Sequence, residues 1–253
     1  MHPAVELALL SAALLIGTLG AAALPIVLKP HPHQTDAMIA FAAGVLLGAA
    51  FFHLLPEAVR DQGPRVLLGT VAGALALFLI ERAVHRHARH AGEVEVHSMM
   101  HGHHGRASSG LTAFIGLSVH TLSDGFGLGS SLAPGLGWVV FVAIFAHQLP
   151  TSFSLSALLR SGGRSAIRTL SACAVFALMV PVGASIYLFA QTGLGELPLM
   201  PWTLAFSAGN FIHLALGDLL PDLRRSQARP MRLVLAFGAG LVMMAVLHVA
   251  LGD

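Results

Sequence analysis

The chain has 253 residues, of which 55% are hydrophobic and only 10% are charged. A soluble domain carries roughly 25% charged residues, so this composition excludes a soluble globular protein. The formal net charge is +2 at pH 7, and we attribute the basic character of the chain to arginine-rich loops, so we infer no nucleic-acid partner.

Apolar stretches of about 20 residues, the length that crosses a bilayer, recur along the whole chain. They predict eight membrane-spanning helices, at 4–28, 36–58, 64–84, 109–132, 136–160, 166–190, 201–222 and 230–251. The fold class is therefore expected to be all-α, as a polytopic protein in a lipid bilayer. Residues 1–253 are expected to form one transmembrane domain.

The basic residues predict how these helices are oriented. Twelve lie beside the loops that follow the first, third, fifth and seventh helices, whereas only Arg60 and Arg65 lie on the other side. Loops rich in Lys and Arg stay in the cytoplasm. We therefore expect these four loops in the cytoplasm and both termini outside, with the protein in the cell (cytoplasmic) membrane.

Two of the predicted helices end in a polar pair with a proline between its members. The pairs are His53 with Glu57 at the outer end of the second helix, and Asp218 with Asp222 at the inner end of the seventh. We expect them to line the two ends of a pathway through the protein. The alternative for Glu57 and Asp222 is an ordinary charge at a helix end. His213, roughly on the Asp218 side, is left open between the pathway and simple packing.

The longest predicted loop, 85–108, is rich in histidine. Tracts of this kind bind metals loosely, so we interpret the loop as a cytoplasmic reservoir or sensor for metal ions. The alternative is a flexible polar connector. The histidines expected to bind metal there are His97, His101, His103 and His104.

The fourth predicted helix carries His120 and Asp124 in the middle of an apolar segment. The i, i+4 spacing places both side chains on one helix face. Ionisable groups at this depth are costly unless they pair or hold an ion, and imidazole with carboxylate suits zinc and similar divalent ions. The alternative is a hydrogen-bonded pair that only joins two helices.

The fifth predicted helix carries His147 at a similar depth, followed by Pro150. The proline cannot donate a backbone hydrogen bond, so it disturbs the preceding turn. We predict His147 as a third metal ligand. Thr151, one turn later, is a weak fourth candidate beside water, and Gln148 is assigned to the pathway.

The chain also contains an internal repeat. Residues 41–57 align without a gap with residues 206–222, which lie 165 positions later. The same offset places the first three predicted helices on the last three, with opposite orientation in the membrane. A 3+3 inverted repeat of this kind is typical of transporters, whose substrate sites lie near the midplane. The fourth and fifth helices fall between the two copies.

These motifs resemble the ZIP (Zrt/Irt-like) family of divalent metal transporters over nearly the whole chain. The matching pieces are HTLSDG at 120–125, AHQLP at 146–150, HLLPE at 53–57 and SAGNF followed by DLLPD within 207–222. The resemblance implies an elevator in which helices 1, 4, 5 and 6 move against helices 2, 3, 7 and 8, and a homodimer. Many members have a carboxylate at the position of Thr151, and some have an acidic residue at that of Gln148, so we expect one ion rather than two.

We therefore predict a transporter rather than an enzyme, which takes up zinc toward the cytoplasm, with Fe²⁺, Mn²⁺ and Cd²⁺ as other candidate ions. The chain has no Walker A sequence and no soluble domain, so we expect no nucleotide or organic cofactor. An intramembrane zinc hydrolase is the main alternative, because it would use the same His and Asp ligands to activate water. A metal-sensing receptor without flux is the second.

Overall fold

The computed structural model describes residues 3–28, 31–92, 104–132, 137–194, 199–224, 226 and 228–251. Within these ranges the chain is helical, with short connecting turns and no strand. The elements are α1 (Pro3–Leu28), α2 (Pro32–Ala49), η1 (Ala50–Leu54), α3 (Leu55–Gln62), η2 (Pro64–Val66), α4 (Leu67–Gly92), α5 (His104–Leu132), α6 (Gly137–Ser161), α7 (Ala166–Leu194), α8 (Leu199–His213), η3 (Leu214–Leu219), α9 (Leu220–Leu223) and α10 (Pro230–Leu251).

The helices extend further than the hydropathy pattern predicted around the histidine-rich segment. α4 continues to Gly92 and α5 begins at His104, so much of the predicted loop 85–108 is helical. The prediction was wrong there because loss of hydropathy marks the end of the apolar span, whereas Arg and Ala favour a helix and His costs it less than about 1 kcal/mol per residue. His97, His101 and His103 lie outside the described residues, as does the side chain of His104.

The protein is a polytopic all-α membrane protein. Six described helical stretches are long and apolar enough to cross a membrane, namely Ala4–Leu28, His33–Arg60, Pro64–Ala83, Gly137–Arg160, Ala166–Ala190 and Pro230–Ala250. α5 and the α8–η3–α9 stretch are not among the six. Both carry polar residues of the predicted site and pathway, which lower their hydropathy.

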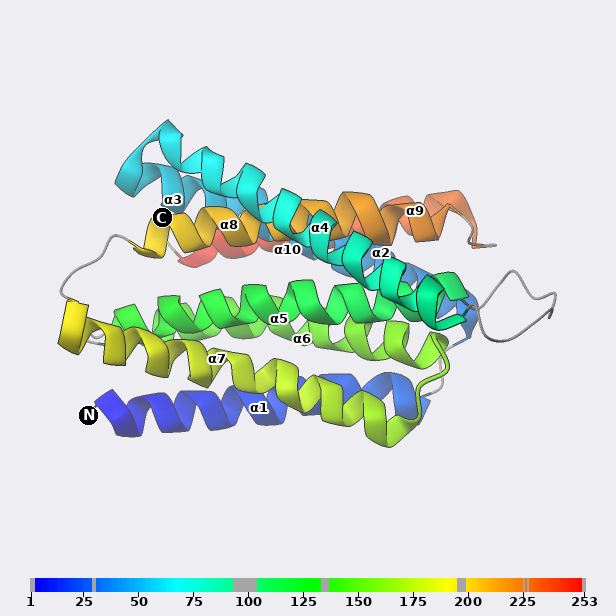
Figure 1. Cartoon of the computed structure of the whole chain (residues 1–253), viewed down its shortest axis with the longest axis horizontal. Helices are drawn as coiled ribbons and strands as arrows, with labels where there is room; N and C mark the ends of the chain where they lie inside the picture. The colour runs from blue at the N-terminus through cyan, green and yellow to red at the C-terminus, as the bar shows by residue number, and fades with distance from the viewer. Residues whose placement is uncertain are drawn as a thin grey trace.

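The helices form two layers (Figure 1). One layer contains α1, α5, α6 and α7, and the other contains α2, α4, α8 and α10. The first layer has its own apolar core, which includes Leu14, Leu128, Ile144 and Val180. Contacts of α2 with α6 and of α5 with α8 join the layers, and both chain termini lie at the same end of the molecule.

Three helix pairs approach so closely that only glycine fits between them. A Cβ atom added at any of these glycines would lie within 3.0 Å of a carbonyl oxygen on the partner helix. Small residues at such positions let two backbones touch inside a membrane. The pairs are Gly44 with Gly240 between α2 and α10, Gly73 with Gly209 between α4 and α8, and Gly125 with Gly183 between α5 and α7.

Two π-helical segments, η1 and η3, interrupt otherwise α-helical rods. Each ends two residues before a proline, Pro56 or Pro221, which cannot donate the backbone hydrogen bond of the next turn. π segments of this kind widen a helix locally and are frequent at functional sites. Here they carry His53 and Asp218, two of the predicted pathway residues.

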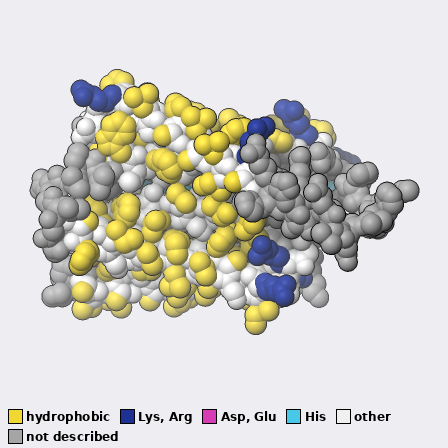
Figure 2. Space-filling view, viewed as in Figure 1, with side chains coloured by type: hydrophobic (Ala, Val, Ile, Leu, Met, Phe, Trp, Pro, Cys, Tyr) yellow, Lys and Arg dark blue, Asp and Glu magenta, His cyan; other side chains and the backbone are white. Residues whose placement is uncertain are grey.

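The outer surface suits a bilayer (Figure 2). On the face shown, hydrophobic side chains cover the middle of the molecule, and Lys and Arg side chains lie toward its two ends. Large apolar side chains such as Phe189 and Val249 are 82% and 78% exposed. In water such exposure would be costly, whereas lipid tails accept these side chains.

Candidate metal site

Three ligand-type side chains converge between α5 and α6. The Nε2 atom of His120 lies 3.0 Å from Oδ2 of Asp124, and Nε2 of His147 lies 3.2 Å from the same oxygen. The two Nε2 atoms are 3.4 Å apart. All three side chains are buried, with exposed fractions of 2%, 7% and 5% in the order His120, Asp124 and His147. The predicted convergence of these residues is therefore present.

The other ring nitrogen of His147 determines what its Nε2 atom can do. Nδ1 lies 2.8 Å from the backbone carbonyl oxygen of Ala143, which can only accept a hydrogen bond. Nδ1 therefore donates its proton, and in the neutral ring Nε2 presents a lone pair. This hydrogen bond also fixes the ring orientation, as the outer partners of metal-binding histidines do.

The lone pair of His147 and the carboxylate of Asp124 then face each other at 3.2 Å. Two acceptors at this distance repel each other unless a cation lies between them. A proton or a metal ion satisfies that requirement. His120 is oriented toward the same point, and its Nδ1 atom is buried without a hydrogen-bond partner in the described part of the chain. The donor set of two imidazoles and one carboxylate matches a site for a zinc-like ion.

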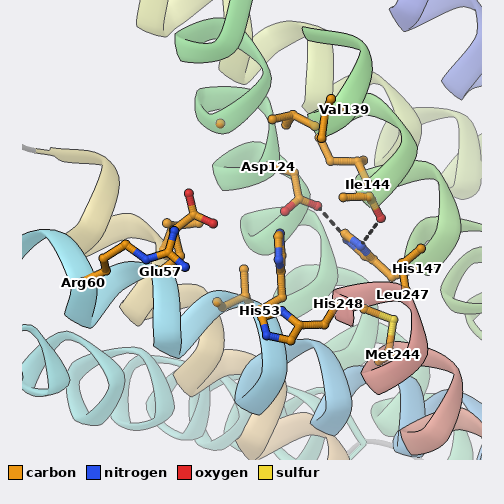
Figure 3. A pocket seen from close by; sticks show the side chains of 15 residues that line it. His53, Glu57, Arg60, Asp124, Val139, Ile144, His147, Met244, Leu247 and His248 are labelled. Atoms are coloured by element: carbon orange, nitrogen blue, oxygen red, sulfur yellow. Dashed lines mark hydrogen bonds and ion pairs between the residues drawn. The ribbon is translucent and has the colours of Figure 1, made fainter. Parts of the chain in front are cut away.

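A cavity of about 310 Å³ leads to this cluster. Asp124 and His147 line its inner part, and Glu57 and Arg60 line another part, where their side chains lie next to each other in Figure 3. The ring of His53 lies between these two parts and points toward Asp124. The predicted assignment of His53 and Glu57 to a route toward the cluster is consistent with this arrangement.

The opposite layer covers the cluster with an aromatic ring. Phe211 of α8 is 1% exposed, and its ring centroid lies 3.6 Å from that of His120 and 6.3 Å from that of His147. The cluster belongs to α5 and α6 in one layer, whereas its apolar cover belongs to the other. It therefore lies at the boundary between the layers.

Thr151 and Gln148 have other partners. The hydroxyl of Thr151 donates to the carbonyl oxygen of His147 over 2.6 Å, and its side chain lines a different, small cavity. The amide of Gln148 donates to the hydroxyl of Thr18 over 3.0 Å and so joins α6 to α1. Gln148 does not line the cavity that leads to Asp124.

The inner pathway residues lie apart from this cluster. His213 and Asp218 form a second group with Glu81 of α4, in which Nε2 of His213 lies 3.2 Å from Oε2 of Glu81. Asp222 belongs to α9, and its side chain is outside those that the structure describes.

Four residues near these groups were missed in the sequence: Arg60, Glu81, Phe211 and His248. His248 of α10 lines the cavity beside His53. A histidine within an apolar helix is itself a signal of function, so His248 was recognisable, although nothing in the sequence indicated its partner. Phe211 resembles any other core phenylalanine until the helices are packed.

Comparison with known proteins gives a consistent result. The family model described as ZIP Zinc transporter matches residues 5–113 and 97–248. Zinc transporter ZIP9 of Micropogonias undulatus is 26% identical over 262 residues, covering 86% of this chain and 84% of the relative. Zinc transporter ZIP13 of Pongo abelii is 25% identical, covering 83% and 65%. Zinc transporter ZIP5 of Homo sapiens is 33% identical over 146 residues, covering 56% and 27%.

Proposed function

The chain belongs to the ZIP zinc transporter family, and we propose that it carries zinc across the cytoplasmic membrane, toward the cytoplasm, through the His120–Asp124–His147 cluster. The family is one of transporters rather than enzymes, so the hydrolase alternative is set aside. The observation that carries the proposal is the convergence of three buried ligand atoms on one point.

The cluster suits transport because its protein ligands are few. A structural zinc site surrounds the ion with four protein ligands, whereas a transport site must also release it. His120, Asp124 and His147 supply three, which leaves room for water. The carboxylate offsets part of the charge of the cation, and both imidazoles bind it as neutral rings. Thr151 is not needed as a fourth ligand, since its hydroxyl donates to a backbone carbonyl.

We propose a single transmembrane domain with eight spans, in which α5 and the α8–η3–α9 stretch complete the six apolar ones. Both termini at one end of the molecule fit an even number of spans. On the face drawn in Figure 2, basic side chains gather mainly at the end opposite the termini. By the positive-inside rule that end is cytoplasmic, and both termini are outside.

We further propose that the two ends of the chain form an inverted repeat. Two features support it at the repeat spacing. The π segment Ala50–Leu54 of the first copy corresponds to Leu214–Leu219 of the second. The glycine contact between α2 and α10 corresponds to that between α8 and α4, because Gly44 and Gly209 are equivalent positions.

The two layers support an elevator mechanism. α1, α5, α6 and α7 hold the cluster and share a core, whereas α2, α4, α8 and α10 supply the cover over His120 and parts of the cavity. We propose that the first layer slides against the second, which moves the cluster from the outer cavity to the cytoplasmic side. We propose that this state faces outward, with Phe211 closing the inner face of the cluster.

Flux measured in liposomes tests this function directly. The purified chain is reconstituted with a zinc-sensitive dye trapped inside, and zinc is added outside. We expect a rise in dye signal that protein-free liposomes lack. A receptor without flux would bind zinc and leave the dye unchanged, which would refute the proposal. Fe²⁺, Mn²⁺ and Cd²⁺ added as competitors would rank the ions.

The carboxylate of Glu57 is expected to attract cations to the mouth of the cavity. Glu57→Gln should raise the zinc concentration for half-maximal uptake about two- to fivefold at low salt, because one partly exposed charge contributes up to about 1 kcal/mol. The difference should shrink at high ionic strength, where charges are screened. Glu6→Gln is the control, since Glu6 lies near the same end but outside the cavity lining. If Glu57→Gln leaves the zinc concentration for half-maximal uptake unchanged at low salt, this role of Glu57 is contradicted.

The histidines between α4 and α5 are expected to be accessory. Replacing residues 93–103 with a Gly-Ser linker of equal length removes His97, His101 and His103 but keeps both helices. Uptake into liposomes should persist, because the central cluster and the cavity are unaffected. Complete loss of uptake in a protein that still folds would show that the segment takes part in transport itself.

A further inference from the structure

We propose a second divalent-cation site, formed by Glu81, His213 and Asp218. The three residues come from α4, α8 and η3. One ligand atom from each lies within 4.8 Å of the others. The site is separate from the transport cluster and does not line the cavity that leads to Asp124.

The imidazole of His213 is held in place on several sides. Its Nε2 atom lies 3.2 Å from Oε2 of Glu81, and its ring contacts that of Phe78 edge-on with the centroids 6.0 Å apart. A Cβ atom added at Gly217 would come within 3.3 Å of the ring. Glycine at this position therefore leaves the space that the ring occupies.

The π segment η3 determines where Asp218 lies. In a regular helix, residues five apart are displaced by more than one turn, so 213 and 218 do not lie directly above one another. The wider turn of a π segment brings such positions closer together. Asp218 thereby joins His213 and Glu81 in one group, although the sequence spacing alone does not place them on one face.

The chemistry of the group fits a hard or borderline divalent ion. Two carboxylates and one imidazole suit Zn²⁺, Mn²⁺ or Fe²⁺. Two negative charges beside one imidazole also favour a cation electrostatically. The neighbouring guanidinium of Arg82 lies 5.2 Å from the ring centroid of Phe78, on which it can stack. The side chains of His213 and Glu81 are 16% and 25% exposed, so the group lies close to the surface of the helix bundle.

An ion bound here would have a role different from transport. All three ligands belong to elements of one layer, so the ion would tie α4 to α8 and η3 without linking the two layers. It would stabilise this layer while the other one moves. α4 continues from Glu81 toward the histidine-rich segment, which is a nearby source of loosely bound metal.

The test counts ions on the full-length chain. The purified protein, with His97, His101, His103 and His104 changed to serine, is dialysed against micromolar zinc, and bound zinc per chain is measured by atomic absorption. The double variant Glu81→Gln, His213→Gln should lose one ion per chain. Asp36→Asn should lose none: Asp36 is a carboxylate of the same layer that accepts a hydrogen bond from Ser226.

A second variant separates this site from the transport cluster. Asp124→Asn with His147→Gln should lose a different ion, and zinc should still raise the melting temperature of that variant. If the Asp124→Asn, His147→Gln variant loses no ion, the result contradicts the proposed transport site and leaves the proposed second site unaffected. If the Glu81/His213 variant is unstable, Asp218→Asn replaces it in the same count. An unchanged zinc count in either variant of the second group would show that Glu81 and His213 only join two helices, and would overturn the proposal.

Discussion

Replacing Asp124 with asparagine is expected to reduce zinc uptake into liposomes by more than about 100-fold. The carboxylate is the only formal negative charge of the central cluster, and both Nε2 atoms face its Oδ2 atom. Loss of a residue that only supports a metal ligand typically costs 10- to 100-fold, so loss of the ligand itself should cost at least as much. Asparagine has the same shape, which keeps the packing around the site.

The matched control for this change is Asp36→Asn. Asp36 belongs to α2, outside the central cluster, and its carboxylate accepts a hydrogen bond from Ser226. This variant should transport at nearly the rate of the unchanged protein. The amount of each variant in the liposomes must be measured and matched, because only then does a difference in initial uptake rate reflect the substitution. Uptake by Asp124→Asn at the unchanged rate would exclude the central cluster as the transport site.

Gly240→Ala is expected to destabilise the protein by about 1–3 kcal/mol, the usual cost of overpacking a tight contact. The new methyl group would lie within 3.0 Å of the carbonyl oxygen of Phe41, which belongs to the backbone of α2 and cannot rotate away. α2 and α10 would have to separate. The apparent melting temperature of the purified protein in detergent measures the effect.

Gly238→Ala provides the matched control on the same helix. Nothing lies within 4 Å of a Cβ atom added at Gly238. Alanine forms helices better than glycine by about 0.5–1 kcal/mol, so this variant should be as stable as the unchanged protein or more stable. Equal melting temperatures for the two variants would contradict the packing of α2 against α10 described here.

The sequence determined most of the fold class and the residues of the central cluster. Apolar stretches of about 20 residues leave little choice but membrane helices. Polar residues in such stretches are costly, so His120, Asp124 and His147 were recognisable as a functional group from position alone. The similarity of residues 41–57 to residues 206–222, 165 positions later, was likewise visible in the sequence.

Other features of the site depended on contacts that no sequence pattern encodes. Phe211 and His248 belong to helices far along the chain from α5, and their positions beside the cluster follow from helix packing. Glu81 joins His213 and Asp218 because α4 packs on α8 and because η3 widens the helix. The roles of Thr151 and Gln148 were decided by hydrogen bonds to His147 and Thr18.

The physical reason for this division is the range of the interactions involved. Insertion of a segment into the bilayer depends on the composition of that segment alone, so each membrane helix can be predicted from its own residues. Ligand geometry depends on which side chains meet across different helices, and that is decided by close backbone contacts such as those at Gly44, Gly73 and Gly125. The sequence therefore determined which residues could bind a cation, and the tertiary structure decided which of them lie close enough together to share one.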